Sequence, residues 1–193
     1  MTEGPREDDW LLSYGEGEPC HYPRFPRGRM MGPVNATRTL IIGLGNPLLR
    51  DDAVGLHVAR QVGATLGRRD DVEVAEESVG GLRLMERMVG FDRAILIDAL
   101  RSGRRPGTVL ALDPRGMRTQ HSASSHDVNL PTALALGRRT GARLPADDRV
   151  EIVAIEVEDV ETFDEKMTEA VSAAVPRAVE RVLAIVARQK EAA

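Results

Sequence analysis

Five short apolar runs, separated mostly by stretches of helical periodicity, constrain the fold of this 193-residue chain more than any other feature. Apolar runs of about four to eight residues bounded by turn residues are typical of buried strands. Apolar residues spaced like Val54, Val58 and Val62 are typical of one face of a helix. The predicted strands are Thr39–Leu44, Val72–Ala75, Ala94–Ile97, Thr108–Leu112 and Val150–Val157, and the predicted helices are 51–66, Leu82–Val89, Asp127–Gly141 and about Thr168–Gln189.

The links between these runs predict how the strands pair. The first three runs are joined through helices, so their strands should be parallel with right-handed crossovers. The link Leu100–Gly107 is shorter than the roughly dozen residues that a parallel crossover needs, so the fourth strand should be antiparallel. Pro176 predicts a kink or a restart in the last helix. We therefore expect an α/β fold, a three-layer α/β/α sandwich on a mixed, mostly parallel five-stranded sheet.

The composition changes near residue 36. Four of the six aromatic residues and five of the eleven prolines precede this point, and so does the single cysteine, Cys20. The segment shows no sustained strand or helix period, so we interpret residues 1–36 as a poorly ordered N-terminal extension. Residues 37–190 are expected to form a single α/β domain.

Charge and composition exclude several classes of function. The formal net charge is −4, which gives no global basic field for binding nucleic acid or anionic lipid. No apolar run approaches the roughly 18 residues of a membrane span, and the acidic N-terminus does not resemble a signal peptide. A single cysteine allows neither an intramolecular disulfide nor a cysteine-based zinc cluster. We expect a cytoplasmic protein, and in the absence of large apolar stripes, a monomer.

Three polar residues are predicted near the carboxyl ends of the parallel strands, where ligands bind in such sheets. Asp52 follows the first strand, Asp98 follows the third, and His126 stands just before a helix. Two carboxylates and an imidazole suit a borderline divalent metal ion and leave open positions for substrate. Such a metal could polarise a carbonyl group or activate a water molecule.

A structural interpretation competes at each of these positions. Asp51 and Asp52 could cap the following helix, where a negative charge suits the helix dipole. His126 could likewise be a surface or capping residue, whereas Asp98 follows a buried run and needs a partner. His57 and His121 are interpreted as structural. From the residues alone the trio remains a hypothesis.

The glycines after the first strand do not indicate nucleotide binding. Gly43 and Gly45 begin a G-x-G pattern, but Leu48 stands where the fingerprint needs a small residue. Asp51 and Asp52 would also repel a pyrophosphate at the helix N-terminus. The glycines more simply allow a tight turn or a close backbone approach.

Three sequence blocks resemble those of the hydrogenase maturation endopeptidases, the proteases of [NiFe]-hydrogenase assembly. They are L-I-I-G-L-G-N-P-L-L-R-D-D-A-V-G, I-L-I-D-A and S-S-H-D-V-N-L-P-T-A-L, in the family's order and spacing. The resemblance covers about Thr37 to Ala187. It implies a mixed-sheet α/β/α sandwich and metal-contacting residues at Asp52, Asp98 and His126.

The resemblance also implies an activity. Such a protease removes a short C-terminal peptide from the hydrogenase large-subunit precursor once nickel (Ni²⁺) has been inserted. The nickel belongs to this precursor and is the recognition handle, so the three residues would complete its shell. We find no Ser-His or Cys-His arrangement that would supply a nucleophile.

The sequence departs from the family pattern at two places, and two alternative functions remain open. The family lacks a long extension like residues 1–36, and Glu156 stands where some relatives carry an amide. We interpret Glu156 and Glu158 as a solvated acidic rim, although Glu156 could also tune which precursor is accepted. One alternative is a non-catalytic metal-binding assembly chaperone that uses the same ligands. The other is a peptidyl-tRNA hydrolase, which shares G-L-G-N-P but not the residues that follow.

Overall fold

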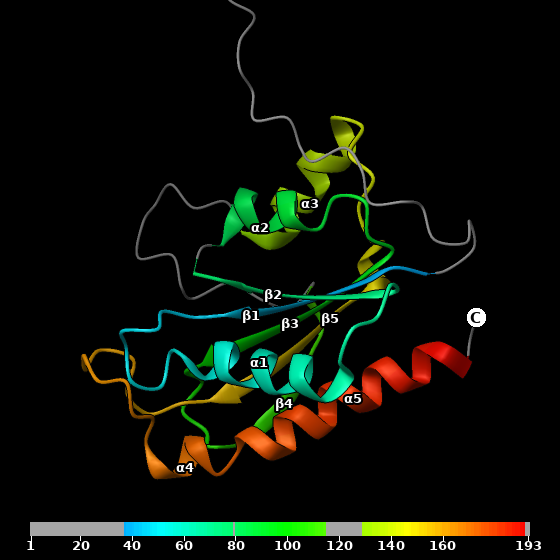
Figure 1. Cartoon of the computed structure of the whole chain (residues 1–193). Coiled ribbons are helices and arrows are strands. Elements are labelled where there is room, and N and C mark those ends of the chain that lie inside the picture. The colour runs from blue at the N-terminus through cyan, green and yellow to red at the C-terminus, as the bar shows by residue number, and fades with distance from the viewer. Residues whose placement is uncertain (1–36, 79, 115–128, 192–193) are drawn as a thin grey trace, which may run out of the picture. The chain divides into compact units, whose positions relative to one another are not determined.

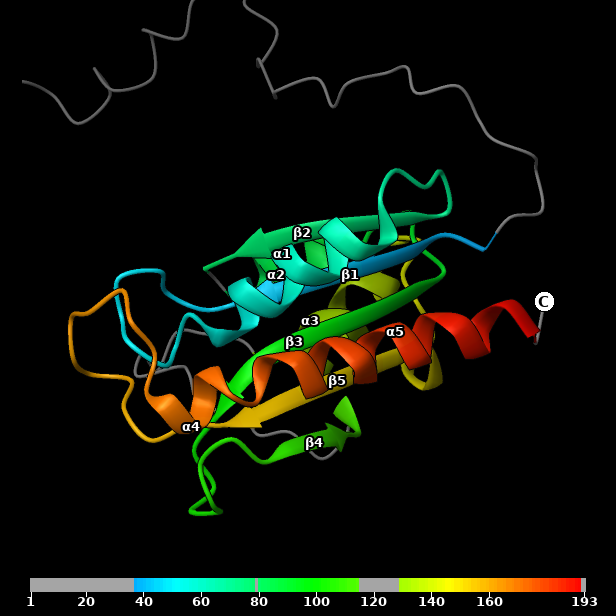
Figure 2. The ribbon, with the colours of Figure 1, turned by 60° about the horizontal axis from the view of Figure 1, so that its bottom comes forward.

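The computed structural model describes residues 37–78, 80–114 and 129–191. Five strands form one sheet in the order β2-β1-β3-β5-β4, and Figure 2 shows them in this order from top to bottom. All neighbouring pairs are parallel except β4 and β5, which are antiparallel as the short link predicts. The strands are β1 (Thr39–Leu44), β2 (Val72–Glu77), β3 (Arg93–Leu100), β4 (Val109–Leu112) and β5 (Val150–Glu156).

Helices cover both faces of this sheet, which confirms the expected three layers (Figure 1). One face packs against α1, α4 and α5 through a core that includes Val58, Ile97 and Val182. The other face packs against α2 and α3 through a second core that includes Leu96 and Leu134. The helices are α1 (Val54–Leu66), α2 (Gly81–Arg87), α3 (Leu130–Arg139), α4 (Glu169–Ser172) and α5 (Val175–Glu191), with a short 3₁₀ turn at Asp147–Arg149.

Several predicted boundaries shift. β3 continues to Leu100, so Asp98 lies within the strand instead of after it. The last predicted helix is two helices, and Pro176 is the second residue of the second one, where its missing N–H is tolerated. Leu136 of α3 is exposed because the helix buries only the face that carries Leu130 and Leu134.

The first turn of α1 lies directly against the ends of two strands. A Cβ atom at Gly55 would clash with the carbonyl oxygens of Leu44 and Ile97, so only glycine allows this approach. Gly45, at φ +147°, turns the chain out of β1 in a conformation that other residues rarely adopt. This close contact sets where the β1–α1 turn lies relative to β3. In the described part of the chain, no helix combines the length and apolarity needed to cross a membrane.

Candidate functional site

Asp52 lies in the turn between β1 and α1. The helix begins at Val54 with Ala53 as its N-cap, and no side chain caps it, so the capping predictions for Asp51 and Asp52 are wrong. The Asp52 carboxylate instead accepts a hydrogen bond from the N–H of Asn46 at 2.6 Å, across the turn. Its side chain is almost entirely buried. The turn therefore holds this carboxylate in a fixed position at the sheet edge.

Asp98 lies inside β3, where it pairs with Ala154 of β5. Ile97 and Ala99 belong to the core under α1 and α5, whereas Leu96 belongs to the core under α2 and α3. Because side chains alternate along a strand, Asp98 is on the same face as Leu96. It is buried, which requires polar partners, and it is engaged in an interaction within the fold.

Contacts of Gly55 tie the start of α1 to the strands that precede and contain the two aspartates. The backbone of Gly55 lies against both Leu44 and Ile97, the residues near the carboxyl ends of β1 and β3. Asp52 precedes Gly55 by three residues, and Asp98 directly follows Ile97. Asp52 and Asp98 therefore both lie in the chain next to this contact between α1 and the sheet, and the meeting of their carboxylates stays a prediction.

The third predicted residue, His126, lies outside the described residues. The nearest described residue, Asn129, is three positions further on and caps α3 by accepting a hydrogen bond from the Thr132 N–H at 3.0 Å. Leu130 of α3 shares a core with Leu96, on the Asp98 face of β3. Within the described ranges, no three His, Cys, Asp or Glu residues form a group that could hold a metal ion.

Asp51 has a different role from its neighbour. It is fully buried, and its carboxylate accepts hydrogen bonds from the segment that follows β5. The Thr168 N–H (2.7 Å) and hydroxyl (3.0 Å) donate to it, and so do the N–H groups of Asp159 (3.1 Å) and Glu158 (3.3 Å). Sequence reasoning missed this role because the donors lie more than 100 residues away and belong to an irregular loop.

Arg50 also holds the loop 158–168 to the turn between β1 and α1. Its Nη2 lies 2.8 Å from Asp164 Oδ2, and its Nε donates to the Lys166 carbonyl at 3.2 Å. Its main-chain N–H donates to the Thr162 carbonyl at 3.0 Å. Donation from the Thr162 hydroxyl and nearby N–H groups, together with Arg50, lowers the pKa of Asp159 to about 2. The loop 158–168 is thus bound to the β1–α1 turn along most of its length; Figure 1 shows the two segments together at the left.

Glu156, at the end of β5, is buried and does not belong to a solvated rim, so that interpretation is wrong for this residue. Its Oε1 accepts from the N–H groups of Ser102 (2.7 Å) and Arg104 (3.0 Å), and its Oε2 accepts from the Ser102 hydroxyl (2.7 Å). Burial raises the pKa of Glu156, but these hydrogen bonds outweigh it and leave the pKa below its usual value. Glu158 is exposed, as a rim residue should be.

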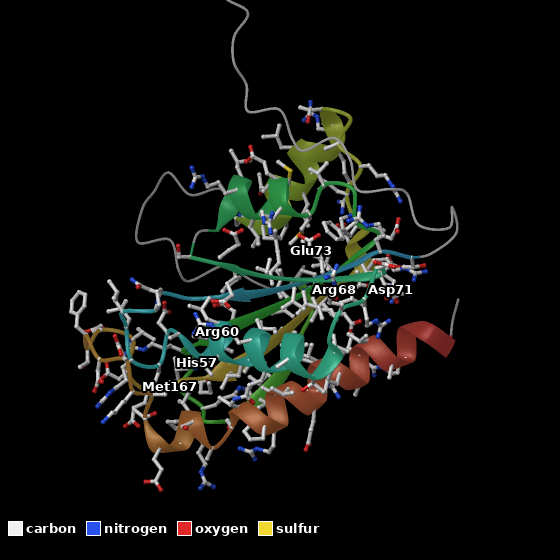
Figure 3. All side chains as sticks on the ribbon, in the orientation of Figure 1. His57, Arg60, Arg68, Asp71, Glu73 and Met167 are labelled. Atoms are coloured by element: carbon white, nitrogen blue, oxygen red, sulfur yellow. The ribbon has the colours of Figure 1, made fainter. Side chains whose placement is uncertain are left out.

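His57 keeps its structural interpretation. It is half-buried on α1, and Figure 3 labels it together with Arg60 of the same helix. Arg60 donates to both carboxylate oxygens of Glu76 at 2.9 and 2.6 Å. Burial and the nearby Arg60 lower the pKa of His57, against an opposing effect of Glu76. The imidazole is therefore favoured in its neutral form beside an ion pair that does not involve the carboxylates of the site.

Comparison with known protein families gives one family match. A family model described as hydrogenase maturation protease (HycI) matches residues 56–185. The hydrogenase 2 maturation protease of Escherichia coli K12 is 29% identical over 150 residues, covering 76% of this chain and 89% of the relative. The hydrogenase expression/formation protein HupD of Rhizobium leguminosarum is 27% identical over 158 residues, covering 80% of this chain and 77% of the relative.

Solved structures agree with this match. The hydrogenase maturating endopeptidase HybD from E. coli superposes with a TM-score of 0.65 at 29% identity, covering 79% of this chain and 93% of that one. The maturation protease HycI from Thermococcus kodakarensis gives a TM-score of 0.57 at 21% identity, covering 77% of this chain and 92% of that one. At this identity it supports the fold alone. The mixed-sheet sandwich expected from the sequence blocks is therefore confirmed.

Proposed function

Because this chain belongs to the hydrogenase maturation protease family, we propose that it removes a C-terminal peptide from a [NiFe]-hydrogenase large-subunit precursor. Membership of the family makes the chain a hydrolase. The family match over residues 56–185 is the observation that carries the proposal. The precursor is the partner, and we place the reaction in the cytoplasm, with the enzyme acting as a monomer.

We further propose that the enzyme recognises the nickel ion already inserted into the precursor. Asp52, Asp98 and His126 would complete the coordination of this ion, which belongs to the substrate. Support comes from the two buried carboxylates at one sheet edge and from the donor set, because carboxylates and imidazole together suit a borderline divalent ion. His126 precedes Asn129, the cap of α3, by three residues, and α3 packs on the face of β3 that carries Asp98.

This arrangement assigns a positioning role to the protein. A carboxylate held by the turn, such as Asp52, fixes the metal and with it the cleavage segment of the precursor. The substrate's nickel can then polarise the scissile carbonyl group or activate a water molecule. Such a mechanism needs no nucleophilic side chain from the enzyme.

Intact-mass spectrometry of the precursor tests the proposal. The nickel-loaded and the nickel-free large-subunit precursor are each incubated with and without the purified full chain. Loss of a short C-terminal peptide only from the nickel-loaded sample is the expected result. An unchanged mass despite a stable complex would overturn the protease and support a non-catalytic assembly chaperone. Cleavage of both samples would keep the protease but overturn its dependence on nickel.

A further inference from the structure

Two large apolar side chains next to the candidate site are unusually exposed. Phe163 is 80% exposed and Leu48 is 58% exposed, the highest values among the large apolar residues that the structure describes. They lie on segments that meet, because Leu49 and Phe163 form an isolated antiparallel bridge. We refer to these two exposed residues, which stand on the two joined segments, as the Leu48–Phe163 patch. Two large apolar side chains this exposed on joined segments are candidates for an interaction surface.

The backbone under this patch is firmly held. The N–H of Asp51 donates to the Asp159 carbonyl at 2.9 Å, and that of Arg50 donates to the Thr162 carbonyl at 3.0 Å. The buried Asp51 carboxylate adds four hydrogen bonds to the same loop. The N–H of Leu48 is itself bonded to the Asn46 side chain at 3.0 Å. The two apolar side chains are therefore presented by a preorganised surface, which lowers the entropy lost on binding.

The patch adjoins the proposed catalytic residues. Leu48 and Asp52 belong to the same turn, four residues apart. On the other side, the loop after β5 reaches the loop after β3 through an ion pair between Arg101 and Glu161 at 3.3 Å. A peptide segment that brings a metal ion to Asp52 and Asp98 would therefore run close to the patch.

We propose that the Leu48–Phe163 patch docks an apolar side chain in the C-terminal region of the hydrogenase precursor, close to the bond that is cut. An exposed aromatic ring is the kind of anchor on which binding energy concentrates, and an exposed aliphatic side chain on the joined segment adds apolar surface. The exposed residues Glu158, Glu161 and Glu165 flank Phe163, so the docked segment should carry neutral or basic residues beside its apolar one. This inference rests on the proposed function, since it takes the precursor as the partner.

Kinetics of precursor processing test the docking role. The variants Phe163→Ala and Leu48→Ala are compared with wild type on the nickel-loaded precursor, together with Val89→Ala as a control. Val89 is also apolar and 45% exposed, but it lies before β3, at the opposite end of the sheet. We expect KM to rise about tenfold for Phe163→Ala and about threefold for Leu48→Ala, with kcat within about twofold of wild type.

The remaining outcomes separate docking from folding and from the proposed function. The melting temperature should not fall, because a side chain this exposed contributes little burial, and Phe163→Trp should restore KM. An unchanged KM for both alanine variants, or an equal rise for Val89→Ala, would overturn the docking surface while wild-type cleavage upholds the protease. If wild type binds the precursor without cleaving it, the dissociation constant replaces KM, and the same pattern upholds docking alone. If wild type neither binds nor cleaves, both proposals are overturned.

Discussion

Two pairs of buried acidic side chains lie near the carboxyl ends of the strands, and their surroundings differ. Asp51 and Glu156 are 0% and 1% exposed, and each accepts several hydrogen bonds from a neighbouring loop. Asp52 and Asp98 are also buried but keep 9% and 8% of their surface exposed. Burial of a carboxylate therefore does not by itself mark a functional residue.

The comparison separates the carboxylates that anchor loops from those that we propose as ligands. Main-chain N–H groups fill the acceptor positions of Asp51 and Glu156, so these carboxylates shape the loops 158–168 and 101–107. A carboxylate that keeps some surface at the sheet edge can reach a bound metal ion. We therefore assign the first pair to structure and propose the second pair for recognition of the precursor.

The largest effect is expected from Asp98→Asn and Asp52→Asn. Each substitution removes a negative charge from the proposed nickel shell while it keeps the side-chain shape. We expect the rate of precursor processing to fall by about 100-fold or more, with the melting temperature within a few degrees of wild type. A single-turnover assay read by intact mass measures this. Wild-type rates in both folded variants would remove these residues from the site.

Asp51→Ala should have the largest effect on stability. It leaves part-buried N–H donors of the loop 158–168 without their acceptor and a cavity where the buried carboxylate was, so the free energy of unfolding should fall by about 3 kcal/mol. Urea denaturation followed by circular dichroism gives the value. Glu158→Ala, in the same loop but exposed, serves as the control and should change it by less than about 0.5 kcal/mol. Equal small losses for both variants would contradict the anchor role.

Substitution of Glu156 should have an intermediate effect on the free energy of unfolding, and this effect should depend on pH. Glu156→Ala should reduce the free energy of unfolding by about 2–3 kcal/mol. Glu156→Gln should cost about 1 kcal/mol, because its amide can still accept from the Ser102 and Arg104 N–H groups and donate to the Ser102 hydroxyl.

The pH dependence of that difference follows from the lowered pKa of Glu156. Above its ordinary pKa of 4.5 the carboxyl is ionised in both the folded and the unfolded chain. Below this pH the unfolded chain binds the proton first, so the stabilisation is lost as pH falls through the folded-state pKa. The stability gap between wild type and Glu156→Gln should therefore narrow from pH 7 to pH 3. A constant gap over that range would contradict the assignment.

Arg50→Met should have the smallest effect. The Arg50 side chain is partly exposed, so its ion pairs with Asp164 and Asp159 are screened by solvent. We expect a loss of about 0.5–1 kcal/mol that shrinks when the salt concentration is raised to about 1 M. A loss as large as that of Asp51→Ala would show that the arginine, and not the buried carboxylate, is the main anchor of the loop.

Much of the fold could be predicted from local sequence signals. The apolar run Thr39–Leu44 is a strand with those bounds, and the short link Leu100–Gly107 correctly predicts that β4 is antiparallel. The apolar run and the short link each involve only a few residues. Burial decides that the run is a strand, and the length of the link decides the direction of β4. The exposure of Leu136 could not be predicted in this way, because helical period alone does not tell which of two neighbouring helix faces the sheet covers.

The site was harder to predict, for a physical reason. Asp52 and Asp98 could be placed at one edge because each is close in sequence to the end of a parallel strand. The roles of Asp51 and Glu156 depend on donors in loops that fold back over long sequence distances, which no local pattern encodes. Two aspartates just before a helix are interpreted as helix caps when their hydrogen-bond donors in distant loops are unknown.

Binding of nickel-loaded and nickel-free precursor shows whether Asp52 and Asp98 recognise the metal ion. Dissociation constants are measured by calorimetry for wild type and for the double variant Asp52→Asn/Asp98→Asn. We expect wild type to prefer the nickel-loaded precursor by about tenfold or more, which is about 1.4 kcal/mol, and the double variant to bind both forms equally. A preference for nickel that survives in the folded double variant would contradict recognition of the metal by these two carboxylates.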